Sequence, residues 1–174
     1  MKNIIQNIRR LFFDNSCTCC GEKASDNLIY LCYNCLDKIV RQKSLNKVGD
    51  TYYIWPYKGE FRKLLLEYKN NSRLALGKII SSLIEEEIFK VVYEEDIDYI
   101  VPIPINFRRE QIRGFNQVEE ILKNLNYSFL KTNRVKNTKK MFKILDKEKR
   151  ENNIKNSFKV DKEFKAKNIL IFDD

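Results

Sequence analysis

The stretch NILIFDD, residues 168–174, does most to decide the fold of this chain. Four apolar residues run directly into two carboxylates, Asp173 and Asp174. A short apolar run of this kind predicts a buried strand. Ligands of open α/β sheets bind beyond the carboxyl ends of the strands. Asp173 and Asp174 thus stand where such a sheet would bind a ligand, although two acids at a strand end are, in isolation, more often solvated charges.

A second apolar run, in DIDYIVPIPI at residues 96–105, predicts another buried strand that Pro102 and Pro104 bring to an end. Helical spacing of apolar residues marks 1–13, 59–69 and 74–93, and a further helix is expected to start near Phe115. The segment TYYIWPY has strand character. Strands that alternate with helices predict an α/β fold with a parallel sheet.

The length of 174 residues predicts one domain with a small appendage. The N-terminal MKNIIQNIRRLFF lacks the continuous apolar core of a secretory signal, and no apolar stretch reaches membrane-spanning length. We therefore expect a cytoplasmic protein without membrane insertion. The polar stretch QKSLNKVGD, at 42–50, is interpreted as a linker between 1–41 and 51–174.

The net charge of +9 is concentrated in one place. Residues 131–167 hold 14 Lys and Arg against 5 Asp and Glu, so the rest of the chain is about neutral. Such a segment could contact phosphates or nucleic acid. It is equally consistent with a solvated lysine-rich face, since the chain is rich in Lys, Asn and Ile throughout. The chain has no histidine, which excludes every His-dependent catalytic or metal site.

Five cysteines fall in CTCCGEKASDNLIYLCYNC, residues 17–35. Cys17 and Cys20 form one C-x-x-C, and Cys32 and Cys35 form a second. Two such pairs at this separation predict a closed four-thiolate metal site, for which zinc is the usual occupant. An iron–sulfur centre also accepts four thiolates. Cys19 is expected to point away from the metal.

The order of these motifs resembles the ComF family of phosphoribosyltransferase-like proteins. The resemblance rests on the paired cysteines, YKGEFRKLLLEYK, DYIVPIPINFRREQIRGFNQVEEIL with its VPIP and RGFNQ elements, the segment from 134 to 158, and the final strand with its two aspartates. It implies a type I phosphoribosyltransferase-like parallel sheet preceded by a small zinc knuckle. The family's Gln in the T-x-x-Q part of the fourth motif has no counterpart near Thr138.

The resemblance also implies a ligand site for phosphoribosyl diphosphate or a nucleotide. Asp173 and Asp174 would bind the ribose hydroxyls, and magnesium would arrive with the substrate. Cationic and polar contacts are expected from Arg108, Arg113, Gly114, Asn116 and Gln117. In the family the final strand continues into a phosphate-binding loop, so we expect a truncated copy with an incomplete sheet and no transferase activity.

Each of these residues also has a purely structural interpretation. Asp173 and Asp174 could be solvated charges at a strand end, Gly114 could permit a positive φ, and Asn116 could cap the following helix. The functional alternative to an enzyme is an accessory factor in DNA uptake during natural competence. Such a factor would use the zinc knuckle and the basic segment to bind single-stranded DNA or a helicase partner.

Overall fold

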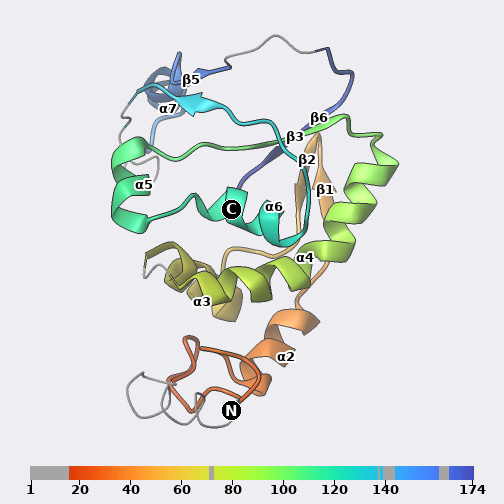
Figure 1. The fold of residues 1–174 in the computed structure, drawn as a ribbon, viewed down its shortest axis with the longest axis vertical. Helices are drawn as coiled ribbons and strands as arrows, with labels where there is room; N and C mark the ends of the chain where they lie inside the picture. The colour runs from red at the N-terminus through yellow and green to blue at the C-terminus, as the bar shows by residue number, and fades with distance from the viewer. Residues whose placement is uncertain (1–15, 71–72, 137, 139–143, 161–164) are drawn as a thin grey trace. The chain divides into compact units, whose positions relative to one another are not determined.

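The computed structural model describes residues 16–70, 73–136, 138, 144–160 and 165–174. The expected helix at 1–13 lies outside these residues. The described residues form a mixed α/β structure with six helices and three two-stranded sheets (Figure 1). Contacts along the chain divide it into two compact units, with the boundary between Ile84 and Glu85. Each unit is therefore described by itself.

The first unit contains the cysteine-rich segment, helix α2 (Tyr33–Arg41), a hairpin and helix α3 (Gly59–Asn70). In the hairpin, β1 (Asn46–Val48) pairs antiparallel with β2 (Thr51–Tyr53). The stretch 42–50, interpreted from the sequence as a linker, thus includes a strand. Gly49, at φ 57°, closes the turn between the two strands, which is a conformation that glycine adopts without strain.

Helix α3 was predicted from its apolar spacing, and its buried side chains are Leu64, Leu65 and Tyr68. The long helix α4 (Leu74–Glu94) was predicted at nearly the same bounds, and it crosses the boundary between the two units. Within the first unit, Gly77 of α4 allows a close approach by α3. A Cβ at Gly77 would lie only 2.8 Å from the Tyr68 hydroxyl oxygen.

The second unit contains a parallel pair of strands, β3 (Tyr99–Pro102) and β6 (Ile169–Phe172). Both strands and their parallel direction were predicted. The prediction that β6 is buried was wrong, because Ile169 and Ile171 are exposed and no residue of β6 is buried. Asp98 holds the start of β6 in place, because its carboxylate accepts hydrogen bonds from the backbone N–H groups of Lys167 (2.6 Å) and Asn168 (3.0 Å). These bonds lower the pKa of Asp98.

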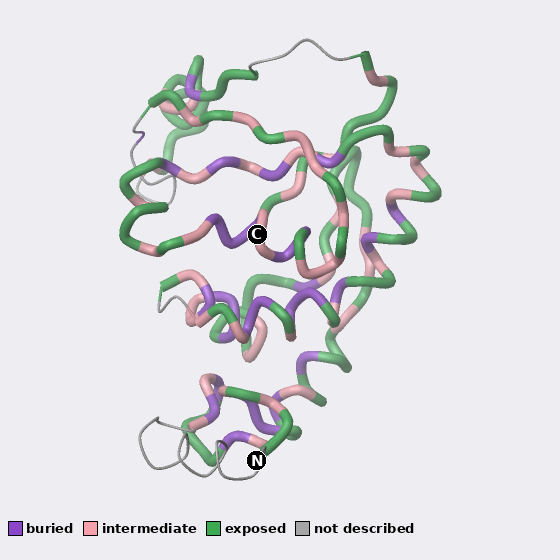
Figure 2. Tube along the Cα trace, in the orientation of Figure 1, coloured by how far each residue is buried: buried purple, intermediate pink, exposed green. Residues whose placement is uncertain are grey.

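Four shorter elements complete the second unit. They are α5 (Phe107–Arg113), α6 (Gln117–Asn124), α7 (Lys147–Ile154) and the antiparallel pair of β4 (Asn133–Arg134) with β5 (Phe158–Lys159). Helix α6 buries one face, whereas α7 buries no residue, as the colouring of Figure 2 shows. Among the described residues, no helix combines the length and apolar character needed to cross a membrane.

Candidate metal centre and ligand site

The first C-x-x-C lies in a tight turn. The N–H of Gly21 donates to the carbonyl of Cys17 at 2.8 Å, and the N–H of Cys17 donates to the carbonyl of Glu22 at 2.6 Å. Gly21 has a φ of 81°, which only glycine adopts readily. Two cysteines separated by two residues and followed by glycine therefore form a turn in which both thiol groups point to the same side.

The second C-x-x-C forms the beginning of helix α2. Cys32 is the N-cap residue, and its Sγ accepts the N–H of Cys35 at 3.5 Å. Cys35, in the first turn, is buried. A helix N-terminus carries partial positive charge, which stabilises thiolates placed there. This second pair is therefore held by a helix, and the sequence analysis had not separated that helix from the knuckle.

The two pairs meet at one point. The four Sγ atoms of Cys17, Cys20, Cys32 and Cys35 all lie within 4.8 Å of one another, and those of Cys20 and Cys32 are 3.7 Å apart. A tetrahedral zinc ion with Zn–S bonds of about 2.3 Å separates its sulfur ligands by about 3.8 Å. The residues present therefore fit a metal ion such as zinc.

The electrostatics of this cluster also suit a cation. Burial raises the pKa of the Cys17 thiol, but N–H groups of Cys20, Cys19 and Cys32 outweigh burial and lower the pKa to about 6. Burial raises the pKa of the Cys35 thiol far above its usual range, and the other cysteine side chains add to this effect. Several thiolates cannot share so small a volume unless a cation compensates their charge.

The fifth cysteine stands apart from the cluster, as expected. The thiol of Cys19 donates to the carbonyl of Glu60 at 3.4 Å. Burial and the nearby charges of Cys17 and Glu60 raise its pKa to about 12, so Cys19 keeps its proton at neutral pH. A protonated thiol is a poor metal ligand.

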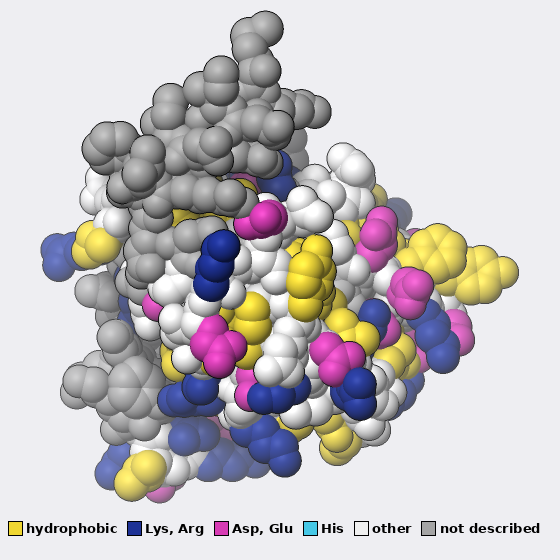
Figure 3. Space-filling view, turned by 90° about the horizontal axis from the view of Figure 1, so that it is seen from below, with side chains coloured by type: hydrophobic (Ala, Val, Ile, Leu, Met, Phe, Trp, Pro, Cys, Tyr) yellow, Lys and Arg dark blue, Asp and Glu magenta, His cyan; other side chains and the backbone are white. Residues whose placement is uncertain are grey.

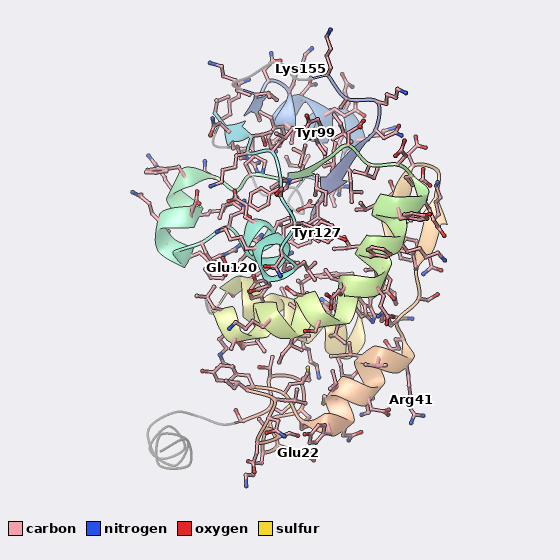
Figure 4. The ribbon with its side chains drawn as sticks, turned by 45° about the vertical axis from the view of Figure 1, so that its right-hand side comes forward. Glu22, Arg41, Tyr99, Glu120, Tyr127 and Lys155 are labelled. Atoms are coloured by element: carbon pink, nitrogen blue, oxygen red, sulfur yellow. The ribbon has the colours of Figure 1, made fainter. Side chains whose placement is uncertain are left out.

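The YKGEFRKLLLEYK motif holds the cysteine knuckle in position, a role that the sequence analysis did not predict. Lys63 Nζ donates to the carbonyl of Cys19 at 2.8 Å. Phe61 stacks on Trp55, with ring centroids 4.2 Å apart, and the indole N–H of Trp55 donates to the carbonyl of Ile39 in α2. Farther along, Arg73 lies over the Tyr30 ring at 4.2 Å. Figure 4 shows Glu22 and Arg41 on the outside of the same unit.

In the second unit, several of the predicted ligand residues meet beyond the carboxyl ends of β3 and β6. The pairing continues past the strands, because the N–H of Ile103 donates to the carbonyl of Phe172 at 2.9 Å. Immediately beyond, Gln117 Nε2 donates to Asp174 Oδ2 at 2.7 Å, and Arg113 Nη1 donates to Gln117 Oε1. Three of the predicted residues thus form one hydrogen-bonded chain.

The RGFNQ element gives this chain its geometry. Gly114 has a φ of 85° and ends α5. Asn116 is the N-cap of α6: its Oδ1 accepts the N–H of Val118 at 3.1 Å, while its Nδ2 contacts the carbonyl of Ile103 at 3.4 Å. The structural interpretations of Gly114 and Asn116 are therefore confirmed. Arg108 lies exposed on α5, outside the hydrogen-bonded chain among the described residues.

Arg134 also belongs to this region, although no pattern in the sequence indicated it. Its side chain is half-buried beside the Phe158 ring, it donates to Thr138 Oγ1, and its Nε finds no partner within the described part of the chain. Burial lowers the pKa of Arg134, the positive charge of Arg109 lowers it further, and the carboxylate of Asp173 opposes both effects. Arg134 stood among many lysines in the sequence, so composition did not distinguish it.

Comparison of the chain with protein-family models, curated proteins and solved structures finds no match. The resemblance to the ComF family therefore rests on the motifs quoted above. It remains a proposal, as does the phosphoribosyltransferase-like fold.

Proposed function

We propose that this chain is a ComF-like protein that binds phosphoribosyl diphosphate or a nucleotide, with a structural zinc ion in its cysteine knuckle. The observation that carries the proposal is the Arg113–Gln117–Asp174 chain of hydrogen bonds. Two motifs, 57 residues apart at Gln117 and Asp174, supply its members. They meet at the carboxyl ends of a parallel pair of strands, where ligands of α/β folds bind.

The side chains suit the parts of such a ligand. Carboxylates at Asp173 and Asp174 can accept hydrogen bonds from the two ribose hydroxyls. The guanidinium of Arg113 can bind phosphate oxygens in bidentate fashion. Magnesium would be bound mainly by the diphosphate of the substrate rather than by a cage of protein ligands. The protein would contribute positioning and electrostatic stabilisation, since no residue of the described site stands out as a general base.

Calorimetric titration of the metal-loaded protein with phosphoribosyl diphosphate and magnesium tests this site. We expect Asp174→Asn to weaken binding about tenfold or more, because a hydrogen bond to a charged group is lost. The asparagine can still accept the amide of Gln117, so the fold should persist. Asp96→Asn is the matched control, since Asp96 is exposed and its positive φ of 48° suits asparagine. Equal affinity for all three proteins would refute the proposed site.

The structural role of zinc follows from the ligand set. Four thiolates complete a tetrahedral shell and leave no position for a substrate. Elemental analysis and the absorption spectrum of the purified protein test the metal's identity. We expect about one zinc per chain and no visible absorption, whereas a brown protein that contains iron would instead favour the iron–sulfur alternative.

A second candidate function is an accessory role in DNA uptake, through single-stranded DNA or a helicase partner. One observation favours it: within 131–167, all the described Lys and Arg residues are exposed except Arg134. Figure 4 shows Lys155 at the end of α7, pointing away from the ribbon. Oligonucleotide binding should weaken steeply with salt, by roughly one log–log unit per phosphate contact. An oligonucleotide affinity that does not change with salt concentration would exclude this function.

A further inference from the structure

The solvent-exposed face of α4 carries two aromatic rings that do not pack in the core. Phe89 is 63% exposed and Tyr93 is 79% exposed. Their rings stack with centroids 6.3 Å apart and planes 9° from parallel. The buried face of this part of α4 is formed by Ile88 and Val91, which lie on the opposite side of the helix. The aromatic pair is therefore directed at solvent.

Acidic residues surround the aromatic pair. Residues 85–98 contain seven Asp and Glu and a single lysine, in a chain whose net charge is +9. Glu85 and Glu86 are exposed and precede Phe89 by four and three residues, so they lie on its face of the helix. We call Phe89, Tyr93 and these two glutamates the acidic aromatic face. Exposed hydrophobic side chains next to acidic ones can be followed in Figure 3.

A surface of opposite character occurs in the same unit, around the β4–β5 pair. Residues 131–136 and 155–160 contain five Lys and Arg and no acidic residue. Between the cations lie three exposed apolar side chains: Val135 at 58%, Val160 at 49% and Phe158 at 40%. The two segments are joined by strand pairing and by a hydrogen bond from Lys136 Nζ to the carbonyl of Lys155. We call these twelve residues the basic patch.

The two surfaces are complementary, because one carries acidic and aromatic side chains and the other carries basic and apolar side chains. We propose that the acidic aromatic face of one copy binds the basic patch of a second copy, so that the chain self-associates head to tail. Lysine side chains can place their charge near Glu85 and Glu86 or over the aromatic rings, while the valines pack against those rings. The contact joins two different surfaces, so each bound copy still offers one free surface, and the assembly extends or closes into a ring.

Sedimentation velocity of the full, metal-loaded chain over a range of concentrations tests this proposal. At low ionic strength we expect the average mass to rise with concentration, and at about 0.5 M salt we expect this rise to diminish, because exposed charges are then screened. The double variant Phe89→Ser/Tyr93→Ser and the double variant Lys136→Glu/Lys159→Glu should each weaken association about tenfold or more. Tyr57→Ser is the control, because Tyr57 is 56% exposed outside both surfaces.

Mixing the two double variants gives the most specific result. The first retains only the basic patch and the second retains only the acidic aromatic face. A head-to-tail contact therefore predicts that the mixture forms a one-to-one complex at concentrations where each variant alone associates far more weakly than the wild type. A wild-type protein that stays monomeric at low salt, or folded variants that form no complex when mixed, would overturn the proposal. So would a basic-patch variant that loses oligonucleotide binding while self-association persists.

Discussion

The five cysteines allow a sharp test of which sulfur atoms bind metal. Cys35 and Cys19 are both buried, at 2% and 5% exposure, and they lie in the same knuckle. Of these two cysteines, only Cys35 contributes its Sγ to the cluster of four sulfur atoms. The substitutions Cys35→Ser and Cys19→Ser therefore make the same chemical change at two sites of similar burial, and they differ only in whether a metal ligand is removed.

The two substitutions should lower the stability of the knuckle by very different amounts. A structural zinc site contributes about 10 kcal/mol or more in comparable peptides, so the loss of one of four thiolates should unfold the knuckle. Cys19→Ser should cost only about 1 kcal/mol, because the serine hydroxyl can still donate to the carbonyl of Glu60.

Elemental analysis after dialysis and the unfolding of each variant in urea measure these effects. We expect Cys35→Ser to lose its metal and Cys19→Ser to retain about one ion per chain. Metal loss from Cys19→Ser equal to that from Cys35→Ser would refute the assigned ligand set.

Three further predictions concern the scaffold. The pKa of Asp98 is lowered in the folded protein, so its carboxylate stabilises the fold above its unfolded pKa, and this contribution disappears as the pH falls through the folded pKa. Asp98→Asn should therefore lower Tm at neutral pH, and the difference in Tm from the wild type should shrink as the pH is lowered through the folded pKa. Leu122 in α6 is fully buried, so Leu122→Ala should lower the free energy of unfolding in urea by about 3 kcal/mol. A decrease of less than about 1 kcal/mol would contradict its place in the core. Gly77→Ala should destabilise the protein by about 1 kcal/mol, since overpacking against Tyr68 exceeds the gain in helix propensity, and Tyr68→Phe should partly restore stability in a double-mutant cycle.

The sequence predicted the elements that have strong apolar patterns. Helices α3 and α4 and strand β3 lie near their expected positions, because each buries apolar side chains. Strand β6 was found from its apolar run, although none of its side chains is buried. Helices α5 and α7 were not predicted, since neither buries a residue and their sequences carry no apolar period. Strand β2 lies within TYYIWPY, where strand character was predicted. Its partner β1 was missed, because a strand of three residues in a polar stretch is too short for a clear alternation.

In the candidate sites, too, features that are local in sequence were predicted and contacts between distant segments were not. The cysteine cluster followed from spacing alone, because each pair is local in sequence. The contact of Gln117 with Asp174 joins distant segments, and only the resemblance had suggested that both belong to one site. Arg134 was missed because its place beside Phe158 depends on strand pairing that no local pattern encodes.

The proposed function requires that the residues beyond β3 and β6 bind a phosphorylated ribose. The phosphorus NMR spectrum of phosphoribosyl diphosphate, recorded with magnesium and increasing amounts of the metal-loaded protein, tests this claim most directly. We predict that the monophosphate and diphosphate signals both shift or broaden, and that Asp174→Asn reduces the change. Signals that stay unaltered at an excess of wild-type protein would contradict the account.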